Sequence, residues 1–232
     1  MLGNGPLALF LDFDGTLVEI APTPDAIEVP QALAARLHDL AARLEGRLGL
    51  ISGRGIADIE SHLGPLQIAR AGSHGIDRRL PDGTPLGGQP LAFPRSVSDE
   101  LQAFACANGF SLESKPHGAA LHYRARPELE GQGLAFAQDL AGRHQLLLKR
   151  GKCVIELVHP GADKGGAVRA FMQDDMFAGS RPLFIGDDVT DEDGFAAVLE
   201  FGGTGILIGD REPTLAQYRL ADPAQLYQWL GL

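Results

Sequence analysis

Short apolar runs recur along this chain and constrain its fold more than any other sequence feature. Residues 7–11 (Leu-Ala-Leu-Phe-Leu), 48–51 and 183–186 are three of them. A strand buried on both faces of a parallel sheet has this composition, because helices cover both of its faces. The segment 30–46, which opens at a proline and closes at a glycine, has the apolar spacing of a helix. Strands that alternate with helices predict an α/β fold with a doubly wound, mostly parallel sheet.

The middle of the chain has a different pattern. Its expected order is helix, two strands, helix, two strands, at residues 96–109, 111–115, 120–124, 127–144, 145–149 and 152–158. This order is typical of an α+β unit inserted between the halves of an α/β sheet. We therefore predict a core domain of residues 1–95 and 161–232 and a cap domain of residues 96–160.

Composition excludes several classes of protein. Among 232 residues, 30 are acidic and 20 are basic, which gives a net charge of −10. A protein that binds duplex nucleic acid needs clustered lysine and arginine, so we expect no nucleic-acid partner. No stretch reaches the roughly 20 apolar residues of a membrane span, and residues 1–6 do not resemble a signal peptide. Cys106 and Cys153 lack metal-site spacing and are interpreted as reduced core thiols. We expect a cytoplasmic protein that binds a small molecule.

Polar residues cluster where the predicted strands end. In open α/β sheets, ligands bind at the carboxyl ends of the strands. A single carboxylate pair beside a glycine is also compatible with an ordinary solvated turn, but four such stations favour a functional site. The stations are Asp12-Phe13-Asp14-Gly15-Thr16, Ser52-Gly53, Asp163-Lys164-Gly165 and Gly186-Asp187-Asp188.

These stations, in this order, resemble the four motifs of the haloacid-dehalogenase superfamily of phosphotransferases, and the resemblance covers the whole chain. It implies that Asp12 attacks phosphorus and forms an aspartyl phosphate. Asp14 would protonate the leaving alcohol and then deprotonate the attacking water, which favours hydrolysis over the chemistry of related ion pumps. Ser52 and Lys164 would stabilise the phosphoryl group by a hydrogen bond and a positive charge.

The resemblance also implies a magnesium site. Asp187, Asp12 and the backbone carbonyl of Asp14 offer the hard oxygen ligands that Mg²⁺ prefers. Asp188 and Asp191 are weaker candidates, since each is placed to support the metal or to cap the following helix. The predicted metal-binding set is Asp12, Asp14, Asp187 and Asp188.

Alternation in the cap strands predicts a polar sheet face. The apolar positions must face the helices, which leaves the charged positions on the other face. For any one of them a solvated surface position is the simpler interpretation, yet a mixed set of donors and acceptors suits the hydroxyls of a polyol. The predicted set is Glu113, Lys115, His122, Arg124, Lys152 and Glu156.

More narrowly, the chain resembles the trehalose-6-phosphate phosphatase family. The matching segments include 12–17, Ile51-Ser52-Gly53-Arg54, Ala71-Gly72-Ser73-His74-Gly75, Glu113-Ser114-Lys115-Pro116, His122-Tyr123-Arg124, 151–156 and 186–192. The resemblance implies that the six cap residues bind the sugar, with Asp12, Asp14, Gly53 and Arg54 completing the substrate site. The alternatives are a phosphatase for sucrose phosphate or a glycosyl phosphoglycerate, a phosphohexomutase, and a non-catalytic sugar-phosphate-binding module.

Overall fold

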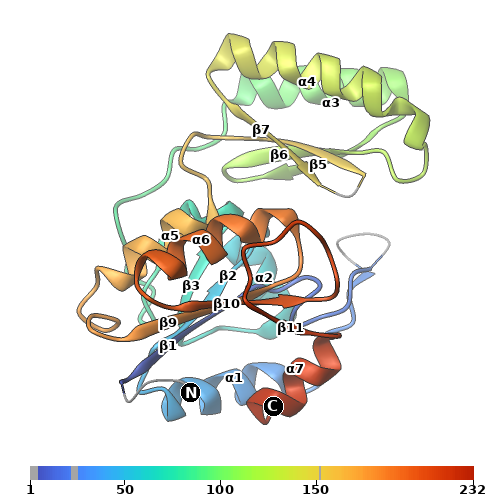
Figure 1. The fold of residues 1–232 in the computed structure, drawn as a ribbon. Coiled ribbons are helices and arrows are strands. Elements are labelled where there is room, and N and C mark those ends of the chain that lie inside the picture. Colours follow the sequence, from blue (N-terminus) through green and yellow to red (C-terminus); the bar gives the residue numbers. More distant parts are fainter. Residues whose placement is uncertain (1–4, 22–25, 152) are drawn as a thin grey trace. The chain divides into compact units, whose positions relative to one another are not determined.

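The computed structural model describes residues 5–21, 26–151 and 153–232, and the chain divides into two compact units (Figure 1). The core unit comprises Met1–Gln89 and Asp163–Leu232, and the inserted unit comprises Pro90–Ala162. The sequence placed these boundaries after residues 95 and 160. The earlier start of the inserted unit has a physical cause, because the amide of Phe93 donates to the carbonyl of Pro116, 2.9 Å away within that unit.

Within the described residues, the core unit contains a seven-stranded sheet in the order β11-β10-β9-β1-β2-β3-β4. All neighbouring strands are parallel except β3 and β4, which confirms the predicted mostly parallel sheet. The strands are β1 (Leu7–Leu11), β2 (Leu48–Ile51), β3 (Ala69–Gly72), β4 (Asp77–Arg79), β9 (Arg181–Gly186), β10 (Thr204–Ile208) and β11 (Tyr218–Leu220). The helices are α1 (Leu33–Arg43), α2 (Ile56–Leu63), η2 (Ser73–Gly75), α5 (Lys164–Met172), η4 (Val189–Asp191), α6 (Glu192–Glu200) and α7 (Pro223–Leu230).

Strand β1 shows why its sequence is continuously apolar. Leu9 and Leu11 pack with α1, α2 and α7 on one face of the sheet. Ala8 and Phe10 pack with α5 and α6 on the other face, so helices cover both sides (Figure 1). Burying a side chain such as Phe10 contributes about 1.5–3 kcal/mol to stability. Strand β1 is also the middle strand of the sheet, so it lies at the centre of the core. A Cβ at Gly49 would lie 2.7 Å from the ring of Phe10, so glycine interrupts the apolar run on β2 to admit that ring.

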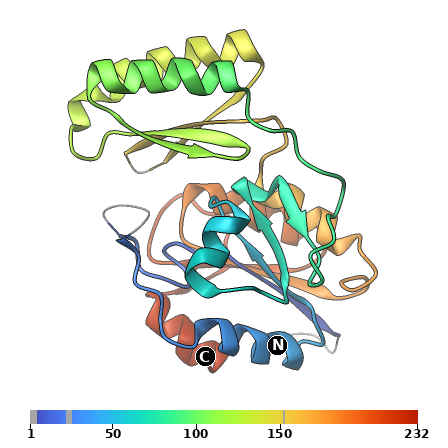
Figure 2. The same cartoon turned by 180° about the vertical axis from the view of Figure 1, so that it is seen from behind.

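The inserted unit is a four-stranded antiparallel sheet in its described part, with the order β5-β6-β8-β7. Helices α3 and α4 cover one face of this sheet, as Figure 2 shows from behind. The buried residues between them include Leu101, Leu140, Ile155 and Leu157. The elements are α3 (Arg95–Asn108), β5 (Ser111–Lys115), β6 (Gly118–His122), η3 (Pro127–Leu129), α4 (Glu130–His144), β7 (Leu147–Gly151) and β8 (Val154–Val158).

Several local predictions differ from the structure. Strand β6 ends at His122, so Arg124 lies beyond the sheet that was predicted to carry it. Lys152 lies outside the described residues. Cys106 is exposed, so its prediction as a core thiol was wrong; it follows the buried Ala105 on α3 and points away from the core. Cys153 is partly buried. Among the described residues, no helix has the length and apolar character needed to cross a membrane.

Candidate active site

Three predicted site residues follow the carboxyl ends of three neighbouring strands. Strands β9, β1 and β2 are adjacent in the sheet, and Asp187, Asp12 and Ser52 come directly after them. The amide of Asp12 donates to the carbonyl of Ile185 at 2.9 Å, and that of Ser52 donates to Ala71 at the same distance. The sheet register therefore brings side chains from distant parts of the sequence to one edge of the core unit.

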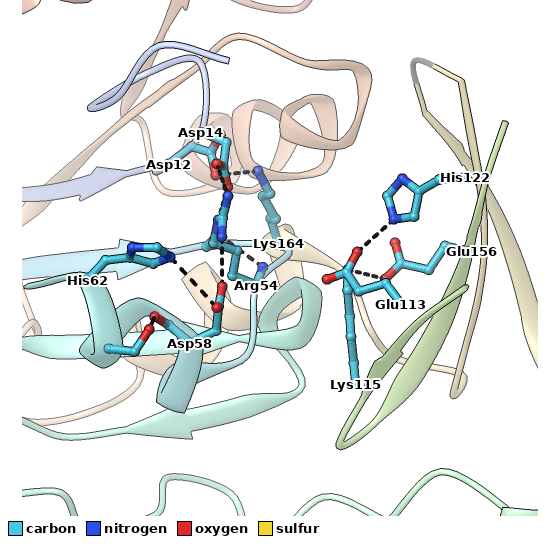
Figure 3. A network of polar contacts seen from close by, with 12 residues as sticks. Asp12, Asp14, Arg54, Asp58, His62, Glu113, Lys115, His122, Glu156 and Lys164 are labelled. Atoms are coloured by element: carbon cyan, nitrogen blue, oxygen red, sulfur yellow. Dashed lines mark hydrogen bonds and ion pairs between the residues drawn. The ribbon is translucent and has the colours of Figure 1, made fainter. Parts of the chain in front are cut away.

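Lys164 joins two buried carboxylates. Its Nζ lies 2.7 Å from Oδ1 of Asp12 and 2.6 Å from Oδ1 of Asp191 (Figure 3 shows the first contact). Lys164 is the first residue of α5, and Asp163 caps this helix by accepting from the amide of Gly166. Burial opposes the lysine charge, but Asp12 and Asp191 outweigh it and raise the pKa of Lys164. The lysine is therefore charged and holds Asp12 in one orientation.

An acidic cluster surrounds this lysine contact. One oxygen each from Asp12, Asp187 and Asp191 lies within 4.8 Å of the others. Burial, and then the charge of Asp191, raise the pKa of Asp12 well above its usual range, although Lys164 acts in the opposite direction. The same two causes raise the pKa of Asp187 to about 7. Oδ1 of Asp187 is buried without a hydrogen-bond partner among the described residues. Crowded carboxylates with an unsatisfied oxygen fit a divalent cation, so this triad could hold one.

The cluster differs from the predicted metal-binding set, because the side chain of Asp191 belongs to it and those of Asp14 and Asp188 do not. Oδ1 of Asp188 accepts from the amide of Val189 and caps η4. Oδ2 of Asp191 accepts from the amides of Asp187 and Asp188, at 3.0 and 2.9 Å. A Cβ at Gly186 would lie 2.2 Å from Cγ of Asp191, so this glycine makes room for the carboxylate. The sequence treated Asp188 and Asp191 as equally weak candidates. The structure distinguishes them, because Asp188 caps η4 whereas Asp191 lies in the acidic cluster.

Asp14 is paired with an arginine that the sequence assigned to substrate. Nε and Nη2 of Arg54 donate to the two carboxylate oxygens of Asp14 at 2.7 and 2.8 Å. Nη1 of Arg54 donates to Oδ2 of Asp58 at 2.8 Å (Figure 3). The sequence interpretation missed Asp58, although its position four residues after Arg54, in the first turn of α2, is a signal for an ion pair. Oγ of Ser52 accepts from the amide of Arg54 at 3.1 Å, and the ring of His74 packs against Gly53.

The inserted unit carries a connected polar network on the sheet face opposite its helices. Nζ of Lys115 lies 2.7 Å from Oε1 of Glu156 and 3.8 Å from Oε1 of Glu113. Nε2 of His122 lies 2.8 Å from Oε2 of Glu113 (Figure 3). Burial raises the pKa of Glu113, but the hydrogen bond with His122 and the charge of Lys115 outweigh it, so the net pKa is lowered. Four of the six predicted cap residues thus meet on one face.

Strand register adds a residue that the sequence interpretation missed. Glu156 on β8 pairs with Ala120 on one side and with Lys149 on the other, which places Lys149 on the same polar face. The available signal was the alternation within residues 147–151, which the predicted strand 145–149 covered only in part. Arg124 is exposed, two residues past the end of β6.

Solved structures share this architecture. A haloacid dehalogenase-like hydrolase from Bacteroides thetaiotaomicron superposes with a TM-score of 0.69 at 17% identity, covering 98% of this chain and 99% of that chain. The C-terminal domain of a trehalose-6-phosphate phosphatase from C. albicans superposes with a TM-score of 0.82 at 24% identity, covering 98% of this chain and 91% of that one. The fold is therefore that of the haloacid-dehalogenase superfamily, as the sequence predicted.

Sequence similarity is more specific than the fold. The family model described as trehalose-phosphatase matches residues 10–224. A trehalose-6-phosphate phosphatase from Escherichia coli K12 is 41% identical over 228 residues, which cover 97% of this chain and 85% of that protein. The chain belongs to the trehalose-phosphatase family, a family of phosphoric monoester hydrolases, and the predicted resemblance is confirmed.

Proposed function

We propose that this protein hydrolyses trehalose 6-phosphate to trehalose and inorganic phosphate, the substrate named for its Escherichia coli relative. One observation supports the chemistry above the others. Asp12, a buried carboxylate at the end of β1, is held by a buried lysine 2.7 Å away, beside two more carboxylates. A nucleophile that must approach an anionic phosphate ester needs such fixed orientation and charge compensation.

The reaction proceeds in two displacements. A carboxylate oxygen of Asp12 forms a bond to phosphorus as the bond from phosphorus to the sugar oxygen breaks, and Asp14 gives its proton to that oxygen. Water then attacks the aspartyl phosphate, Asp14 takes the water proton, and phosphate leaves with Asp12 restored. Ser52 donates a hydrogen bond to the phosphoryl oxygens, and Lys164 contributes positive charge.

We propose Mg²⁺ as the cation of the acidic triad. Asp12 and Asp187 would hold it through carboxylate oxygens and Asp14 through its backbone carbonyl, whereas Asp191 would support these residues through its contacts with Lys164 and the amide of Asp187. Asp188 caps η4 through its Oδ1, and its role as a metal ligand stays a prediction from the sequence. When bound, Mg²⁺ neutralises negative charge on the phosphoryl group.

The polar face of the inserted unit is proposed to recognise the sugar. Carboxylates accept from hydroxyl groups, while Lys115 and His122 donate to hydroxyl oxygens, so the mixed set suits vicinal hydroxyls. Two carboxylates, Glu113 and Glu156, already position Lys115 there. The roles of Gly53, Arg54, Arg124 and Lys152 in substrate binding stay predictions from the sequence, as does the cytoplasmic setting.

Phosphate release from a panel of sugar phosphates, with and without Mg²⁺, tests the proposal. We expect Mg²⁺-dependent release with a clear preference for trehalose 6-phosphate. Preference for sucrose phosphate or a glycosyl phosphoglycerate would keep the chemistry and change the substrate. A bound sugar phosphate that releases no phosphate would favour the non-catalytic binding module, and one that isomerises would favour the mutase.

A further inference from the structure

The guanidinium group of Arg54 is directed at the protein's own carboxylates. Two of its nitrogens donate to the two oxygens of Asp14, at 2.7 and 2.8 Å, in the paired geometry that a planar guanidinium forms with a carboxylate. Arg54 is only 7% exposed, whereas the Asp14 side chain is 35% exposed. The fixed member of this pair is therefore the arginine, and the member that it orients is Asp14.

Other contacts fix Arg54 itself. Oδ2 of Asp58 accepts from Nη1 at 2.8 Å, and Asp58 lies on α2, whose first residue is Ile56. The backbone amide of Arg54 donates to Oγ of Ser52, which ties the arginine to the end of β2. Its Cζ lies 5.9 Å from the ring centroid of Phe13. The backbone of Arg54 is thus tied to the end of β2, while its guanidinium contacts a helix residue and an aromatic ring.

We propose that Arg54, braced by Asp58, is a positioning residue that holds the carboxylate of Asp14 where it exchanges protons with the leaving sugar oxygen and the attacking water. This inference rests on the acid–base role proposed for Asp14. Proton transfer depends steeply on placing the acid within hydrogen-bond reach, so a rotating carboxylate loses rate. Each carboxylate oxygen has two lone pairs, so the arginine pair leaves one on each oxygen for the transferred proton.

A leaving-group comparison tests this role. Trehalose 6-phosphate has a poor leaving group that needs a proton, whereas 4-nitrophenyl phosphate has an activated one that does not. General acid–base catalysis contributes roughly 10²–10⁴-fold, and misplacing the acid forfeits part of it. In rapid-quench measurements of phosphoenzyme formation, we expect Arg54→Met to slow the sugar phosphate about 10–100-fold and the aryl phosphate less than about 3-fold. Asp58→Asn should give the same pattern with a smaller loss, and KM for trehalose 6-phosphate should change little.

A double-mutant cycle separates this role from direct phosphate binding. If Arg54 acts through Asp14, adding Arg54→Met to Asp14→Asn should cost less than about 3-fold, because the group that it positions is already gone. Equal losses on both substrates that persist in the Asp14→Asn background would assign Arg54 to the phosphoryl group and overturn the inference. If Asp14→Asn alone affects both substrates equally, the acid–base role proposed for Asp14 fails, and the inference fails with it.

A second buried arginine provides a matched control. Nε of Arg70 lies 2.9 Å from Oε1 of Glu60, Arg70 is 8% exposed, and Glu60 lies on the same helix as Asp58. Arg70→Met and Glu60→Gln should leave the ratio of the two substrates unchanged, even where they lower stability. If they shift the ratio as Arg54→Met does, packing of α2 explains the effect and the positioning role is refuted. Should Arg54→Met fail to fold, Asp58→Asn decides the outcome alone.

Discussion

The two units hold their charged residues in different ways. In the core unit the charged side chains gather beyond strand ends and at the start of α5; Asp12 and Lys164 are 4% and 2% exposed, while the Asp14 side chain stays 35% exposed. In the inserted unit they lie along the strands, on one sheet face, and Glu113 keeps 31% of its side chain exposed. A strand end can be directed at one reacting atom, whereas a sheet face offers a row of contacts. The core geometry thus suits a fixed reaction and the sheet face suits recognition of a larger molecule.

The two units also differ in how their surroundings shift the pKa values of their carboxylates. Burial and a neighbouring carboxylate raise the pKa of Asp12 and Asp187, so the surroundings of the core cluster disfavour the ionised forms of these two groups. For Glu113 the contacts with His122 and Lys115 outweigh burial and lower the pKa. The contacts within the inserted unit thus favour the charged form of Glu113, whereas burial in the core cluster opposes the charged forms of Asp12 and Asp187.

Removing the proposed nucleophile of the core unit should cause the largest loss of activity. Asp12→Asn keeps the shape of the side chain but not its nucleophilic oxygen, so we expect turnover to fall by about 10³-fold or more. The protein should still fold, because Lys164 keeps its contact with Asp191. Steady-state kinetics and thermal unfolding check both points. Substantial hydrolysis by contaminant-free Asp12→Asn protein would exclude Asp12 as the nucleophile.

Removing Mg²⁺ tests the metal site proposed for the core unit. Chelation should lower activity by about 10²-fold or more, and added Mg²⁺ should restore it. Mg²⁺ should also raise the thermal unfolding midpoint of the wild type, because it binds the folded state, and should do so much less for Asp187→Ala. Identical midpoints with Mg²⁺ and with excess chelator would count against a metal site in the triad.

Truncating side chains on the polar face of the inserted unit should affect only the larger substrate, trehalose 6-phosphate. Lys115→Ala, His122→Ala and Glu156→Ala should each lower kcat/KM for trehalose 6-phosphate roughly 10–100-fold, at about 1.4 kcal/mol per decade. Hydrolysis of 4-nitrophenyl phosphate should change little. Arg143→Ala is a matched control, because Arg143 forms an ion pair with Glu100 on the helical side of the same unit. Wild-type rates for all three variants would remove the recognition role.

The smallest effect concerns the pH dependence of stability. Because folding lowers the pKa of Glu113 below its ordinary 4.5, its contribution is complete above pH 4.5 and is lost as the pH falls through the folded-state value. Between pH 5 and 3.5, Glu113→Gln should therefore lose less stability than the wild type, by about 1 kcal/mol or less for a partly exposed pair. Thermal unfolding across this range measures the difference. Parallel curves for the two proteins would show that the pair contributes nothing.

The central strands could be predicted from the sequence and the edges could not. Residues 7–11 and 48–51 form strands with the predicted bounds, because burial on both faces demands continuous apolar side chains. Strands β4 and β11 have three residues each and partly exposed side chains, so no periodicity marks them. They exist because β3 and β10 supply partners.

The site residues also divide into those that the sequence located and those that it did not. Motif spacing located Asp12 and Ser52, which directly follow strands, and Lys164, which begins α5. The pairing of Arg54 with Asp14 joins residues 40 positions apart, and such a contact is defined only by tertiary packing. Arg124 was misplaced because β6 ends two residues earlier than the alternation suggested.

The point where the chain returns to the core unit has a consequence for exchanging modules between relatives. The returning segment ends at Ala162, and the next residue, Asp163, caps the helix that Lys164 begins. A chimera joined after Ala162 keeps this cap, whereas one that replaces Asp163 loses about 1 kcal/mol of helix stability next to the lysine. At the other junction, residues 86–90 form neither helix nor strand, so a graft has several joining points there before Phe93, whose amide donates to Pro116. A chimera between relatives therefore has one suitable joining point where the inserted unit ends, and several where it begins.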